Sequence, residues 1–123
     1  MPISQRAQRL RTNLRLAVLE NITALNRQRK AAVQAGDGDA ATNIQDDING
    51  LHDRLDDLSF LSLQDLEDSR EVTQTITDLQ KAAGDLEDEA GKIQSIADAL
   101  KKGAEIADKI SKIIVKLRDI IPV

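Results

Sequence analysis

The chain has few residues that could do acid–base or metal chemistry. It contains one histidine, His52, and no cysteine. A zinc site is usually built from several histidine, cysteine or carboxylate ligands, and a lone histidine cannot complete one of the usual kind. On a helix His52 falls on the side away from Leu51 and Leu55. We therefore interpret it as a solvent-exposed residue with no catalytic role.

The segment Asp37-Gly38-Asp39 has the acidic spacing with which a calcium-binding loop begins. An EF-hand loop also requires a glycine at its sixth position and a glutamate at its twelfth. Counted from Asp37, those positions hold Thr42 and Ile48, so a turn followed by a helix N-cap at Asp39 explains the aspartates better. The sequence also lacks a glycine-rich phosphate loop, a nucleophile elbow and a zinc-protease motif. We therefore predict a protein that is not an enzyme and that uses no cofactor and no metal.

Charge is distributed unevenly along the chain. Residues 1–35 carry seven basic side chains and one acidic one, residues 36–91 carry three basic and sixteen acidic, and residues 92–123 carry seven basic and four acidic. Segregation of this kind indicates that segments attract one another within the fold or attract a partner of opposite charge.

Four of the basic residues lie close together near the N-terminus and are called the arginine cluster: Arg6, Arg9, Arg11 and Arg15. Cations in the first turns of a helix oppose its dipole, and like charges four residues apart repel each other. We therefore expect carboxylates to face the cluster, from the second helix or Glu87–Glu89 of the same chain or from an acidic protein partner. Nucleic acid is disfavoured, because the net charge is −4 and there is one aromatic residue to stack on bases.

The elements that position these residues are all predicted to be helices. Apolar residues recur at helical spacing and no stretch alternates with the period of a strand. The fold class is therefore an all-α antiparallel bundle, one domain over residues 1–123, with four helices at about 4–35, 39–59, 62–83 and 85–120. The alternative is three helices, of which the C-terminal one is very long.

The choice between these folds depends on Gly84. Lys81 before it and Asp85 after it are typical of one helix ending and another beginning, whereas the apolar spacing continues through it. We place a break at Gly84, because one helix over residues 63–120 would be about 87 Å long and the other helices could not cover it. Gly103 is a second candidate hinge. Ser62, followed by Asp65, is the expected start of the third helix.

A seven-residue repeat of small and large side chains runs through the C-terminal half and is called the alanine seam: Leu79, Ala83, Leu86, Ala90, Ile93, Ala97, Leu100 and Ala104. A heptad repeat keeps one side of a helix against a neighbour, as in a coiled coil, and small residues let the neighbouring backbone approach closely. The seam predicts tight helix–helix packing.

Leu16 and Leu19 lie off the apolar stripe of the first helix. Together with the arginine cluster they are the candidate contacts with a protein partner or with another copy of the chain. The function we expect is a non-enzymatic helical module that binds a partner helix or self-associates.

The segment Ile106–Ile121 is amphipathic, with isoleucines on one side and Lys109, Lys112 and Lys116 beside them. A cationic amphipathic helix can lie on a membrane surface. The alternative function is therefore a membrane-active helical protein, such as a component of an α-helical pore-forming toxin. A core-facing helix with solvated lysines explains the same pattern. Without a secretory signal pattern at its beginning, the chain is expected in the cytoplasm.

Overall fold

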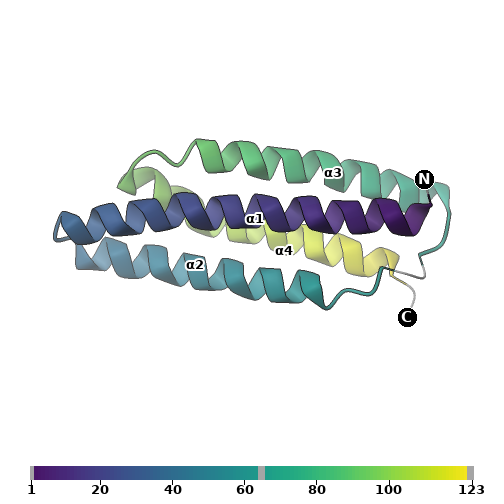
Figure 1. The fold of residues 1–123 in the computed structure, drawn as a ribbon, viewed down its shortest axis with the longest axis horizontal. Helices are drawn as coiled ribbons and strands as arrows, with labels where there is room; N and C mark the ends of the chain where they lie inside the picture. The colour runs from purple at the N-terminus through teal and green to yellow at the C-terminus, as the bar shows by residue number, and fades with distance from the viewer. Residues whose placement is uncertain (1, 64–65, 122–123) are drawn as a thin grey trace.

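A computed structural model describes residues 2–63 and 66–121. Over these residues the chain forms four helices and no strand: α1 (Ile3–Gln34), α2 (Gly38–Ser59), α3 (Arg70–Gly91) and α4 (Ile96–Ile120). They lie side by side in one elongated bundle, each antiparallel to the helix before it (Figure 1). The predicted four-helix bundle is confirmed, and the three-helix alternative is wrong.

The turn between α1 and α2 follows from one glycine. Gly36 has φ = +76°, a conformation that glycine adopts without steric cost. Its N–H donates to Val33 O at 3.1 Å and the Asp37 N–H donates to Ala32 O at 2.9 Å, which is the Schellman arrangement for ending a helix. Asp37 is also the N-cap of α2, since its side chain accepts from the Ala40 N–H. The N-cap prediction of Asp39 is wrong by two residues.

The third helix begins later than predicted. Ser62 belongs to the non-helical connection between α2 and α3, and Asp65 lies outside the described residues. The N-cap is Ser69, whose hydroxyl accepts from the Val72 N–H at 3.2 Å.

The predicted break at Gly84 is wrong, because α3 continues through it to Gly91. The spacing of Leu79, Ala83 and Leu86 keeps α3 buried against the bundle, and this burial outweighs the roughly 1 kcal/mol cost of a glycine inside a helix. The break comes instead before Ile96, and Gly103 lies inside α4.

The start of α4 has a clear local signal. The Ser95 hydroxyl accepts from the Asp98 N–H, and the Asp98 carboxylate accepts from the Gln94 N–H, both at 3.1 Å. This is close to the capping-box arrangement. A serine followed three residues later by an acidic residue occurs both at Ser62 and at Ser95. Only Ser95 begins a helix, so this local pattern alone does not show where a helix begins.

The helices that follow each other in sequence do not all pack together. The helix α1 packs against α2, α3 and α4, whereas α2 and α3 do not touch. The pairs α1/α3 and α2/α4 run in the same direction (Figure 1). Hydrogen bonds follow this arrangement: Arg6 and Asn21 of α1 bond to Thr77 and Leu86 of α3.

One polar side chain is fully buried between α1 and α3. Asn21 is 0% exposed, and its Nδ2 donates to Ala17 O at 2.8 Å and to Leu86 O at 3.0 Å. Its Oδ1 has no partner among the described residues. A buried amide that bonds to one backbone position of a neighbouring helix favours one register over others, so Asn21 aligns α1 with α3.

Gly103 allows α2 to lie close to α4. A Cβ atom at this position would lie 2.8 Å from Cγ of Asp47 and 3.0 Å from its Cβ. Burial, and secondarily the neighbouring Asp46 carboxylate, raise the pKa of Asp47. The close packing of α2 on α4 therefore requires that residue 103 have no side chain, as in glycine.

Gly84→Ala and Gly103→Ala should change stability in opposite directions. Nothing lies within 4 Å of a Cβ at Gly84, so alanine there should stabilise the fold by about 0.5–1 kcal/mol through its helix propensity. Alanine at Gly103 should destabilise it by about 1–3 kcal/mol, because the added methyl meets Asp47.

Urea unfolding followed by far-UV circular dichroism measures both effects, since the chain has no tryptophan or tyrosine. Adding Asp47→Ala should restore stability to Gly103→Ala. An equal gain from both alanines would show that Asp47 does not pack on Gly103.

Candidate functional site

The alanine seam forms only in part. Its first five residues, Leu79, Ala83, Leu86, Ala90 and Ile93, are buried. The remaining three, Ala97, Leu100 and Ala104, are exposed, so the prediction of one continuous packing surface is wrong. The reason is the break at residues 92–95, which changes the register, and α4 turns Ala99, Gly103 and Ile106 to the core instead.

Leucine substitutions should test the register of α4. Ala99→Leu should destabilise the fold by about 1–3 kcal/mol, because Ala99 is 0% exposed in the core and a close-packed position has no room for three more carbons. Ala97→Leu should change the free energy of unfolding by no more than about 0.5 kcal/mol. Thermal melts followed by circular dichroism compare the two, and equal losses would contradict the observed register.

Three members of the arginine cluster bond within the molecule, but to neutral oxygens. Arg11 donates to Leu61 O at 2.7 Å, Arg15 to Ser59 Oγ at 3.0 Å, and Arg6 to Thr77 Oγ1 at 3.2 Å. Ser59 ends α2, and Leu61 follows it in the connection. Cations are favourable at the C-terminal end of a helix. Among residues 2–63 and 66–121 no carboxylate forms an ion pair with the cluster, which instead faces the C-terminal end of α2 and the side of α3.

Arg9 lies at the N-terminal end of a groove between α1 and α3. It lines a hollow together with Arg6, Ile76 and Gln80. Among the described residues Arg9 makes no side-chain hydrogen bond and no ion pair. Of the four arginines, it remains the one available to a partner.

Leu16 and Leu19 are exposed, at 55% and 40%. Both lie at the middle of α1, one helical turn apart. The other exposed large apolar residues, Val33, Phe60, Leu100 and Val115, are isolated from one another in sequence. Single exposed apolar residues are ordinary, whereas two together on one turn form a patch.

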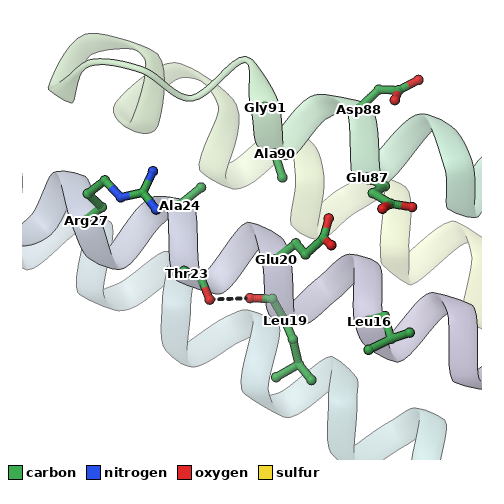
Figure 2. Close-up of a pocket in the computed structure, with 10 residues that line it drawn as sticks. All are labelled: Leu16, Leu19, Glu20, Thr23, Ala24, Arg27, Glu87, Asp88, Ala90 and Gly91. Carbon is green, nitrogen blue, oxygen red and sulfur yellow. Dashed lines mark hydrogen bonds between the residues drawn. The ribbon is translucent and has the colours of Figure 1, made fainter.

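The two leucines border the α1/α3 groove, which consists of the hollow at Arg9 and two further hollows that share Leu16, Glu20 and Glu87. Figure 2 shows the larger hollow, of about 650 Å³. Its remaining residues are Leu19, Thr23, Ala24, Arg27, Asp88, Ala90 and Gly91. The smaller hollow adds Asn13, Gln80, Ala83 and Gly84.

Small residues account for the depth of the groove. Ala24, Ala83 and Ala90 are buried along it, and Gly84 and Gly91 leave the outer side of α3 without side chains at two positions seven residues apart. A second backbone can approach closely over such residues, as in tightly packed helix pairs. Sequence reasoning selected Ala83 and Ala90 for packing but missed that they also floor a groove.

Carboxylates dominate the charge of this groove. Glu20 of α1 and Glu87 of α3 both extend into the space between the helices, whereas the carboxylate of Asp88, which also lines the hollow, points away from α1 (Figure 2). Arg27 is the cation nearest to them along α1. Within the described parts of the chain the ion-paired acids are Glu89 and Asp108, so none of the three groove carboxylates is neutralised by an ion pair.

Glu89 sits beyond the groove and joins α3 to α4. Its carboxylate pairs with Lys102 at 2.9 Å, Lys92 at 3.4 Å and Lys109 at 3.9 Å. The hydrogen bond from Lys102, aided by the other two lysines, lowers the pKa of Glu89, and the same bond raises the pKa of Lys102. Glu89 is therefore an electrostatic link between α3 and α4.

Glu89→Gln should make stability less dependent on acidic pH. Because the pKa of Glu89 is lowered in the folded state, its contribution is complete above its ordinary value of 4.5 and is lost as the pH falls through the folded value. Wild type should therefore exceed the variant in free energy of unfolding at pH 7, and the two should converge near pH 3.

The control is Asp108→Asn, which removes the exposed pair with Lys112 and should cost no more than about 0.5 kcal/mol at either pH. A constant difference between wild type and Glu89→Gln from pH 7 to pH 3 would contradict the link.

The apolar side of α4 faces the core. Ile106, Ile110, Ile113, Ile114 and Leu117 are buried, and Ile120 and Ile121 pack against the same cluster. The core interpretation of this segment is confirmed. None of the helices in the described residues is long and apolar enough to cross a membrane. Likewise, residues 2–63 and 66–121 bring no three histidine or acidic side chains together in a metal-holding arrangement.

No protein family model, curated protein or solved structure matches the chain. We therefore infer the role of the α1/α3 groove from its shape, its leucines and its carboxylates.

Proposed function

We propose that the protein is a non-enzymatic helical module that binds another helix, of a partner or of a second copy, on the α1/α3 groove. The observation that carries the proposal is the exposure of Leu16 and Leu19 on one turn at the centre of the bundle. Exposing two neighbouring leucines has a hydrophobic cost that covering them would recover, at roughly 25 cal/mol per Å². A contiguous apolar patch beside a groove is typical of a protein contact surface.

The shape of the groove supports a helix as the bound element. Its two walls are the parallel helices α1 and α3 (Figure 1), and its floor consists of alanines. An amphipathic helix lays side chains at helical spacing into a groove of this kind. Of the partner contacts expected from the sequence, Arg6, Arg11 and Arg15 bond within the chain. Leu16, Leu19 and Arg9 are the contacts that we propose for the partner.

The membrane-active alternative has weaker support. Its apolar surface, on α4, is already packed in the core, so lipid binding would require α4 to leave the bundle. The α1/α3 groove needs no such rearrangement.

The variant Leu16→Glu/Leu19→Glu should abolish association while leaving the fold intact, because both side chains are exposed. Val115→Glu, at a position 54% exposed on α4, is the matched control and should behave as wild type. Light scattering after size exclusion, detected by refractive index, measures self-association. Affinity capture with quantitative mass spectrometry measures partners that wild type and the control retain but the leucine variant loses.

Two results would contradict the proposal. One is a wild-type protein that stays monomeric and captures nothing that depends on the two leucines. The other is an assembly or partner that the leucine variant keeps and Val115→Glu loses.

A further inference from the structure

We infer that the helix bound by the α1/α3 groove is a basic amphipathic helix, with lysines or arginines flanking an apolar stripe. The inference rests on the proposed function and adds the chemistry of the partner. The charge of the groove carries it, because Glu20, Glu87 and Asp88 line the same hollow as Leu16 and Leu19.

The arrangement of the carboxylates explains why a cation is required. Glu20 and Glu87 come from different helices and extend into one space (Figure 2). Covering these two carboxylates with an apolar surface would remove the water that screens them, and a buried charge without a partner is strongly unfavourable. A partner that buries Leu16 and Leu19 must therefore neutralise these carboxylates, and a flanking lysine or arginine does so.

The charge pattern also fixes where the partner's cations lie. Arg6 and Arg9 line the N-terminal end of the groove, whereas Glu20 and Glu87 lie at its centre beside Leu16. The bound helix therefore places its basic residues over the central part of α1, between the leucines and Arg27.

A second copy of the chain fits this surface less well than a basic helix. Both ends of α1 carry exposed cations, Arg9 at one end and Arg27 and Lys30 at the other. A parallel α1 would bring Arg9 against its own equivalent, and an antiparallel one centred on the leucines would bring it near the equivalents of Arg27 and Lys30. Like-charge contacts of this kind disfavour association.

The test uses two synthetic helical peptides of about three heptads, labelled with fluorescein. Both carry leucines on one stripe; one has lysines beside the stripe and the other has glutamates at the same positions. Fluorescence anisotropy should show Kd for the lysine peptide at least about tenfold lower than for the glutamate peptide at low salt, with the preference shrinking as salt screens the charges.

Variants locate the binding site. Glu20→Gln/Glu87→Gln should remove most of the charge preference, about tenfold in Kd. The control Glu105→Gln/Asp108→Asn makes the same change in net charge at exposed positions of α4 and should keep the preference. Leu16→Ala/Leu19→Ala should weaken binding of both peptides.

The outcomes separate the inference from the proposed function. Equal affinity for both peptides that is still lost with Leu16→Ala/Leu19→Ala would overturn the basic helix and retain helix binding. Binding that ignores the two leucines would overturn both. Absence of lysine-peptide binding, or a wild-type dimer that the leucine variant abolishes and that excludes the peptide, would overturn the basic helix.

Discussion

The structure depends on the packing of α1 against the three other helices. The buried residues of α1, which face these helices, are small or aliphatic apart from Asn21 and Gln28. Asn21 bonds to a backbone carbonyl of α3. The solvent-facing side of α1 is mostly polar, so the exposure of Leu16 and Leu19 on it is informative.

The same packing decided where the helices end. Gly84 and Gly103 are both interior to helices because the sides on which their neighbours lie are buried, and tertiary burial outweighs the weak preference of one glycine. Their roles nevertheless differ. Gly103 is a contact point for Asp47, while Gly84 faces the groove with open space beside it. From the sequence alone, one cannot tell whether a glycine ends a helix, allows a neighbouring helix to approach, or lies on an open surface. All three roles depend on the absence of a side chain.

The basic N-terminal segment and the acidic segment make different kinds of contact in the folded chain. The arginine cluster bonds to the C-terminal end of α2 and to α3, where backbone and hydroxyl oxygens take the place of the expected carboxylates. On α3, three lysines neutralise Glu89, whereas Glu87 extends into the groove and has no ion pair among the described residues. These two residues of α3 therefore have different electrostatic surroundings, because positions on a helix point in different directions.

The sequence by itself determined the helical class, the core side of α1, of α2 and of the C-terminal part of α4, and the off-stripe position of Leu16 and Leu19, because these follow from local periodicity. It did not determine the break at residues 92–95, the core side of the first turns of α4, the later start of α3, the parallel pairing of α1 with α3 or the partners of the arginines. Those depend on which helices become neighbours in the bundle. The groove belongs to this second group, since its leucines and its carboxylates come from helices that only the tertiary structure brings together.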